Sequence, residues 1–204
     1  MARVELRDIV RKRRMVHRFT RQPVADETLL RILEIARHAP SAGFSQGFRL
    51  VVLDDPGRLE WFWRVTTPPE ELPELDERIA TGPPVIVLPF SSKAVYLDRY
   101  SAPDKAEFGL QSEEAWPVPF WHVDAGMAIM LILLAAIDEG LGAWYFGLFH
   151  GGTDLLPELG VPEHYALLGA IAIGHRSPDD VKTRGSAYSR TRISADDLVR
   201  HSHW

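Results

Sequence analysis

The stretch "VDAGMAIMLILLAAIDEGLGAWYFGLF", Val123 to Phe149, joins a long apolar segment to an aromatic one and decides the fold class. Its apolar run from Ala125 to Ile137 is shorter than the roughly 20 residues that span a bilayer. Two acidic residues close the run, so we expect a buried helix and no membrane span. Gly140 and Gly142 supply a helix stop signal, and the aromatic residues after them predict a strand.

The segments on both sides of this stretch predict further helices and strands. Apolar spacing predicts helices in residues 4–14 and 24–40, the second with Asp26 as its N-cap and Pro40 at its end. Buried strands are expected in "FRLVVLDD", "PPVIVLPFS" and "ALLGAIAIGH", and short helices in "RLEWFWRV", residues 76–80 and "TDLLPELG". Residues 91–120 are expected to be irregular, as a lid or binding loop would be.

This order of elements predicts an α+β protein, with mixed α/β layers, in one domain covering residues 1–204. It lacks the regular βαβ alternation of a Rossmann unit, and no GxGxxG follows the first strand. If a nucleotide binds, side chains must therefore hold its phosphate.

Composition narrows the possible chemistry. The chain has 204 residues, no cysteine and a formal net charge of −5. The absence of cysteine excludes disulfides, thiol nucleophiles and iron–sulfur ligation, so redox chemistry would need a bound cofactor. Arginine clusters run against the acidic average and call for a local reason such as a phosphate. The first residues contain no continuous apolar region of the secretory type, so we expect a cytoplasmic protein.

Four short motifs are candidate sites, and each has a plain structural alternative. "RKRRMVHRF" could bind a phosphate or form a solvated basic surface, and "SRTRIS" could be a second phosphate contact or a surface strand. The small residues of "APSAGFSQG" could border a flat ligand or form an ordinary turn. The glycine inside "GLGAWYFGLF" could mark close approach of a ligand or a bend.

Together, the order and spacing of these motifs resemble the FMN-dependent nitroreductase family, from about Arg11 to Arg192. The resemblance implies a central, mostly antiparallel sheet flanked by helices. It also implies an intertwined homodimer with both active sites at the interface, where the helix Val123 to Ile137 would pack. It assigns FMN contacts to Arg13, Arg14, Met15, His17, Ser41, Ala42, Gly43, Gly147, Leu148, Arg190 and Arg192.

Several positions depart from the family pattern. Met15 stands where serine is common, and His17 stands where lysine or arginine is common, so one hydrogen bond to the phosphate is lost and one charge becomes dependent on pH. Phe44 and Gly47 replace asparagine and proline. FMN binding is still expected, whereas these changes favour an unusual choice of substrate.

The resemblance implies hydride transfer from NAD(P)H to the flavin and then to a nitroaromatic, a quinone or another small flat acceptor. The flavin would carry the hydride, so no catalytic side chain is named. Candidate substrate contacts are Phe44, Trp116, Phe120 and Trp121. The alternative for these aromatic residues is a place in the dimer core.

Other functional classes stay open on the sequence alone. One is a flavin-binding storage or regulatory protein without turnover, and another is a specialised relative that acts on a flavin or other ring substrate. A nucleic-acid-binding module is suggested by "RKRR" alone, and the acidic net charge argues against it. The terminal "HSHW" has no carboxylate partners nearby, so no metal site is expected.

Overall fold

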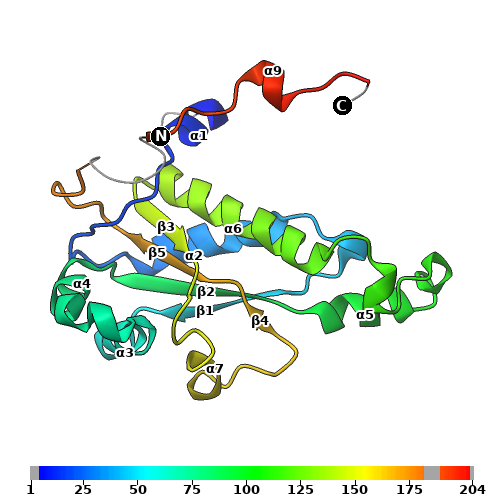
Figure 1. Ribbon diagram of the computed structural model, residues 1–204, viewed down its shortest axis with the longest axis horizontal. Helices are drawn as coiled ribbons and strands as arrows, with labels where there is room; N and C mark the ends of the chain where they lie inside the picture. Colours follow the sequence, from blue (N-terminus) through cyan, green and yellow to red (C-terminus); the bar gives the residue numbers. More distant parts are fainter. Residues whose placement is uncertain (1–4, 182–188, 203–204) are drawn as a thin grey trace.

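The computed structural model describes residues 5–181 and 189–202 (Figure 1). Its centre is an antiparallel sheet in the order β1, β2, β5, β3, with the short strand β4 paired to the end of β2. The strands are β1 (Phe48–Leu53), β2 (Val85–Ser91), β3 (Gly142–Phe146), β4 (Ala166–Leu167) and β5 (Ala170–Gly174).

Helices cover both faces of this sheet. One side carries α2 (Asp26–Glu34) and α6 (Phe120–Asp138), and the other carries α3 (Pro56–Thr66), α4 (Leu75–Thr81) and α7 (Leu155–Glu158). The remaining helices are α1 (Leu6–Lys12), α5 (Lys93–Ser101) and α9 (Ala195–Leu198). Single 3-10 segments occur at Ile35–His38, Ala42–Phe44, Pro69–Glu74, Ala106–Phe108 and Glu113–Ala115.

The central strand β2 explains why two cores form. Successive side chains of a strand point to opposite faces, so a strand covered on both sides must be apolar throughout. Val85 and Val87 pack in the core beneath α2 and α6, whereas Ile86 and Leu88 pack beneath α3, α4 and α7. All residues of β2 are buried. The predicted α+β class, with an antiparallel sheet flanked by helices, is therefore confirmed.

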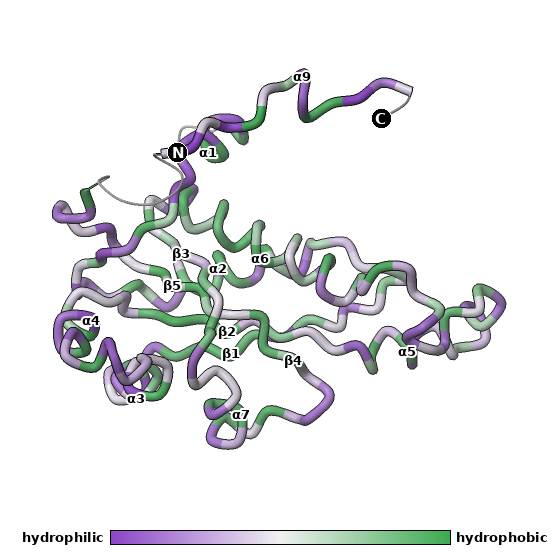
Figure 2. Tube along the Cα trace, in the orientation of Figure 1, coloured by the Kyte–Doolittle hydropathy of each residue, from purple (hydrophilic) through white to green (hydrophobic). Residues whose placement is uncertain are grey.

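The helix α6 has two apolar faces, one covered and one open. Its inner face packs on the sheet, while Val123, Met127 and Met130 on the outer face are exposed. By length and composition alone α6 could cross a membrane, but nearly half of it is buried inside the protein, as a core helix is. Figure 2 shows that most of α6 is hydrophobic, with a few hydrophilic positions.

Two sequence-based expectations were wrong in detail. The section expected to be irregular contains α5, whose N-cap Ser92 accepts a hydrogen bond from the Val95 N–H at 3.4 Å. Tyr96 and Tyr100 are buried one helical turn apart, so packing of their rings outweighs the weak apolar pattern of this segment. Asp26 is the first residue of α2 rather than its cap, and Ala25 occupies the cap position without a side-chain bond.

Candidate functional site

The basic stretch Arg11 to Arg18 lies against the edge strand of the sheet. After α1 ends, Met15 forms a parallel bridge with Ala143, and the Val16 N–H donates to the Ala143 carbonyl at 3.1 Å. Val16 is buried beside Gly142, where a β-carbon would come within 2.8 Å of the valine side chain. Glycine at position 142 thus allows the basic stretch to approach β3 closely.

The predicted FMN contacts of this stretch fall into two hollows. Arg13 and Arg14 line a crevice of about 490 Å³ at the C-terminal end of α6, together with Arg11, Lys12 and Arg176. His17 lines a separate hollow of about 290 Å³, with its ring centre 4.5 Å from that of Trp144. Met15 packs against the core, so its side chain contributes no polar contact.

The hollow beside His17 has aromatic walls and a cation. Trp144 stacks on Phe146 with ring centres 4.2 Å apart, and Phe146 lies parallel to Trp63 at 6.0 Å. Arg78 of α4 lines the same hollow and forms an ion pair with Glu71. Flat apolar surface and a nearby guanidinium are the features that accommodate an aromatic ring with a polar edge.

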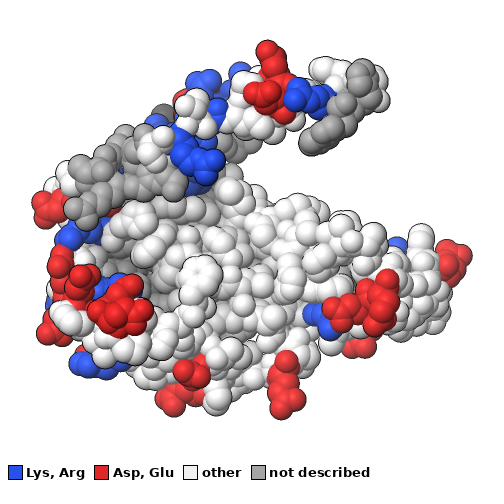
Figure 3. Space-filling view, in the orientation of Figure 1, with Lys and Arg blue, Asp and Glu red and all other residues white. Residues whose placement is uncertain are grey.

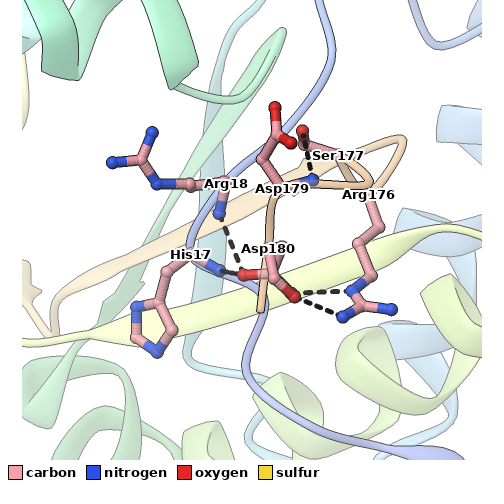
Figure 4. Close-up of polar contacts among 6 residues, drawn as sticks. All are labelled: His17, Arg18, Arg176, Ser177, Asp179 and Asp180. Atoms are coloured by element: carbon pink, nitrogen blue, oxygen red, sulfur yellow. Dashed lines mark hydrogen bonds and ion pairs between the residues drawn. The ribbon is translucent and has the colours of Figure 1, made fainter. Parts of the chain in front are cut away.

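Asp180 ties the basic stretch to the turn that follows β5 (Figure 4). Its Oδ1 accepts hydrogen bonds from the backbone N–H of His17 at 3.0 Å and of Arg18 at 3.3 Å. Its Oδ2 accepts from Arg176 Nε at 2.7 Å, and Arg176 Nη2 also donates to the Asp180 carbonyl. Burial alone would raise the pKa of Asp180, but these donors outweigh it and lower the pKa. We call these four residues the Asp180 cluster.

The small-residue loop Ser41 to Gly47 is held in an unusual backbone conformation. Gly43, Phe44 and Gln46 all have positive φ angles, of 59°, 57° and 52°. Two of these are not glycine, and such conformations persist only where the surroundings fix them. Ser41 Oγ accepts from the Gln46 N–H at 3.0 Å, and Ser45 Oγ donates to the Ala42 carbonyl at 2.6 Å.

A buried acid on α6, Asp124, holds the loop from Ser41 to Gly47. Asp124 Oδ2 accepts from the Ala42 N–H at 2.8 Å and from the Tyr96 hydroxyl at 2.7 Å. Arg99 Nε donates to the Gly43 carbonyl at 2.9 Å, which fixes the other side of the turn. Burial, together with the neighbouring Asp124 carboxylate, raises the pKa of Tyr96, so its hydroxyl stays a donor.

The loop borders a third hollow of about 360 Å³, lined by Ser41, Gln46, Gly47, Tyr96 and Asp124 among others. Phe44 projects outward and is 72% exposed. Its ring is therefore available to a ligand or to a second protein chain.

The predicted positions Gly147 and Leu148 lie directly after the last residue of β3. A β-carbon at Gly147 would come within 3.0 Å of the Phe149 ring, and Phe149 itself is fully exposed. Gly147 itself is exposed, so its backbone is accessible to a ligand except on the side that the Phe149 ring covers.

The basic pair near the C-terminus, Arg190 and Arg192, lies in a different environment from Arg13 and Arg14. Arg190 and Arg192 are exposed, as are all residues from 189 to 202. Neither residue is among those that line the crevice of Arg13 and Arg14. Of the terminal "HSHW", His203 and Trp204 lie outside the described residues, and among the described ones no cluster of three potential metal ligands occurs.

The aromatic residues predicted to contact substrate separate into buried and exposed ones. Trp116 and Trp121 are buried in a cluster with Tyr96 and Tyr100, and Trp116 Nε1 donates to the Leu110 carbonyl at 2.9 Å. These two rings therefore pack the start of α6 and the segment before it onto α5. Phe120, at the start of α6, is 36% exposed.

Sequence reasoning missed Asp124, Tyr96, Arg176 and Asp180. Asp124 carried a signal, because it is an acid inside an apolar helical run, and a buried charge needs partners. Asp180 and Arg176 sit in a polar segment that also contains Asp179, so nothing in the sequence separates the buried acid from the exposed one.

Comparisons with known proteins show the family to which the chain belongs. The family model described as "Nitroreductase family" matches residues 10–175, which is most of the chain. The chain belongs to the nitroreductase family. The matched region begins just before the basic stretch and ends just after β5, so it contains the residues described above for the three hollows except Arg176. The predictions of this family and of an oxidoreductase are confirmed.

Three similar proteins illustrate the relationship. The nitroreductase-family chain is 26% identical over 198 residues to the FMN reductase (NAD(P)H) of Bacillus subtilis (strain 168), covering 92% of this chain and 74% of that one. A Desulfovibrio desulfuricans protein solved in complex with FMN has a TM-score of 0.68 and 24% identity, covering 100% of this chain and 99% of that one. The NADPH:FMN oxidoreductase from Vibrio harveyi, solved with NAD+, has a TM-score of 0.70 and 18% identity, covering 98% and 77%.

Proposed function

We propose that this nitroreductase-family protein is an FMN-dependent oxidoreductase of the cytoplasm, which takes hydride from NAD(P)H and passes electrons to a small flat acceptor such as a nitroaromatic or a quinone. The observation that carries the proposal is the crevice where Arg13, Arg14 and Arg176 gather in a chain of net charge −5. Such a concentration of cations against the overall charge matches a phosphate group.

The donor chemistry of the described residues fits FMN. Guanidinium groups bind phosphate with paired hydrogen bonds, and the crevice at the end of α6 offers them. The aromatic hollow with His17 and Arg78, and the open backbone after β3, offer surfaces for a ring system. Bound FMN would supply hydride transfer, which no side chain of this cysteine-free protein can supply.

The chain's own residues would bind FMN, orient it and enclose the site. Arg13 and Arg14 would hold the phosphate, and Gly147 and Leu148 would present backbone groups to the ring. The loop from Ser41 to Gly47 would border the site, with Asp124 keeping the Ala42 N–H in place. Phe44 would form a flat wall for the acceptor, because its ring is exposed at the tip of a fixed turn.

A homodimer completes the proposal. Val123, Met127 and Met130 form an exposed apolar strip on α6, beside Gly126, whose open surface lets another helix approach closely. Figure 3 shows a broad uncharged face below the projecting C-terminal segment, with an open space between them. A second copy placed against α6 would cover this face, and an obligate interface buries about 2,000 Å² or more.

The test is the visible absorption of the purified protein, followed by anaerobic addition of NADH or NADPH. Bound flavin absorption that bleaches on addition of either nucleotide, and returns when a quinone is added, is the expected result. Protein that binds no FMN would overturn the proposal. Protein that binds FMN but is not reduced by either nucleotide would instead favour a storage or regulatory role.

A further inference from the structure

Asp180 is a carboxylate in an unexpected place. It is largely buried and lies next to Arg176, which lines the crevice proposed to hold the FMN phosphate. A negative charge there opposes anion binding unless its own partners neutralise it. A role for Asp180 in flavin binding rests on the proposed function, since it concerns the same crevice.

The hydrogen-bond and ion-pair partners of Asp180 compensate its negative charge. One oxygen is occupied by two consecutive backbone N–H groups, those of His17 and Arg18, and the other by the Arg176 guanidinium. The two backbone groups are 163 and 162 positions away in the chain, so the carboxylate joins two ends of the fold. Figure 4 shows the side chains of His17 and Arg18 pointing away from Asp180 while their backbone points toward it.

This arrangement determines which way the basic stretch faces. Fixing the backbone at His17 and Arg18 sets the stretch between the two hollows, with His17 directed to one and Arg13 and Arg14 to the other. The same carboxylate fixes Arg176 at the border of the crevice. Asp180 lines neither hollow among the residues described, so it acts through its neighbours.

We propose that Asp180 is a positioning residue for the phosphate end of the FMN site, and that it sets the preference of the protein for FMN over riboflavin. FMN and riboflavin share the ring and the ribityl chain and differ in the phosphate. The hollow proposed for the ring also contains His17, but its Trp144 and Arg78 walls do not depend on Asp180. Loss of Asp180 should therefore weaken FMN binding much more than riboflavin binding.

The fold has other ties in the same region, so the loss of Asp180 should not unfold the protein. The Val16 N–H still bonds to the Ala143 carbonyl, and the Phe19 N–H still bonds to the Thr81 carbonyl. The Thr20 N–H bonds to the His175 carbonyl at 2.8 Å. The stretch would keep its place on the sheet and lose the fixed orientation at its centre.

The experiment measures dissociation constants of FMN and riboflavin, by flavin fluorescence, for apoprotein of the wild type and of Asp180→Ala, Asp180→Asn and Asp179→Asn. Asp179 is the matched control, because it is adjacent and exposed and its side chain takes no part in the Asp180 cluster. At metal sites, loss of a partner that orients a ligating side chain typically costs about 10- to 100-fold in affinity, and we take the same range for a group that orients phosphate donors. We expect a loss of that size for FMN in Asp180→Ala and a smaller one in Asp180→Asn.

Riboflavin affinity should stay within about threefold in every variant, and Asp179→Asn should match the wild type for both ligands. Equal losses for FMN and riboflavin, or no loss for FMN, would overturn the positioning role. If Asp180→Ala does not fold, Asp180→Asn decides by the same ratio of affinities. Wild-type protein that binds neither flavin would instead contradict the proposed function itself.

Discussion

The two basic groups assigned to the phosphate differ in how firmly the chain holds them. The stretch from Arg11 to Arg18 is fixed by backbone bonds to β3 and by Asp180, and its arginines line a defined crevice. Arg190 and Arg192 belong to a fully exposed segment. The difference indicates that one half of the proposed phosphate site is built into the single chain, and that the other half is placed by a ligand or a second copy.

The double substitution Arg190→Ala with Arg192→Ala should give the largest effect. A hydrogen bond to a charged group contributes about 1.5–3 kcal/mol, so loss of both should weaken FMN binding by roughly 3–6 kcal/mol. This corresponds to about a hundred- to ten-thousand-fold in affinity. Titration of apoprotein with FMN measures it, and the purified variant should be folded and colourless.

A matched control lies in the same segment. Arg200 is exposed and pairs with Asp197, and Arg200→Ala should leave FMN affinity within about threefold. If the double variant purifies yellow with wild-type affinity, Arg190 and Arg192 are surface charges and the site has only its fixed half.

A charged substitution on the outer face of α6 tests whether Arg190 and Arg192 need a second copy of the chain to reach the phosphate. Met130→Glu should prevent dimer formation in light scattering, because Met130 is 45% exposed in the apolar strip and a buried unpaired charge is unfavourable. FMN affinity should fall by no more than in the double arginine variant. Adding Met130→Glu to the double arginine variant should weaken FMN binding little further, since the dimer-breaking change and the double arginine change remove the same contact.

The control for this change is Leu72→Glu, at an exposed apolar residue outside α6. It should remain dimeric and bind FMN normally. A Met130→Glu monomer that keeps wild-type FMN affinity would show that one chain holds the cofactor alone.

Asp124→Ala should lower the stability of the protein, because Asp124 holds the loop from Ser41 to Gly47. It leaves the Ala42 N–H and the Tyr96 hydroxyl without their acceptor, and each buried unsatisfied group costs about 1–3 kcal/mol. A decrease of roughly 2–6 kcal/mol in the free energy of unfolding is expected in urea denaturation. The neighbouring exposed Asp98→Ala should change little. A value near zero for Asp124→Ala would mean that the loop is held by its other bonds.

The smallest effect concerns pH. The pKa of Asp180 is lowered in the folded protein, so its contribution to stability is present above the unfolded value, near about 3.9, and is lost as pH falls through the folded value. The stability difference between wild type and Asp180→Asn should therefore be constant near neutral pH and shrink in acid. A difference that grew in acid would contradict the assignment of the ionised form.

Much of the fold could be predicted because apolar patterns report burial directly. The strands β1 and β2 and the helix α6 carry mainly apolar runs, and the structure has them close to the expected bounds, whereas the strand expected in "ALLGAIAIGH" is divided into β4 and β5 around Gly169. The helix α5 could not be predicted in this way, because its stability comes from Tyr96 and Tyr100 packing against tryptophans from a later segment. Such contacts depend on tertiary structure that local pattern does not contain.

The candidate site also contains residues that the sequence predicts and residues that depend on tertiary contacts. The residues proposed to contact a ligand, such as Arg13 and His17, can be selected by residue type and by the family resemblance, and they line two hollows. The residues that hold them, Asp124 and Asp180, are acids whose partners are distant in sequence. Only the folded chain shows which of two adjacent acids, Asp179 or Asp180, turns inward.

The central claim is that FMN binds with its phosphate between a fixed and an exposed basic group, and a crystal structure of the FMN-loaded protein tests it most directly. We expect the phosphate oxygens within hydrogen-bond distance, about 2.7–3.2 Å, of Arg13 or Arg14 and also of Arg190 or Arg192. A phosphate bound away from the crevice that Arg13 and Arg14 line would contradict the account.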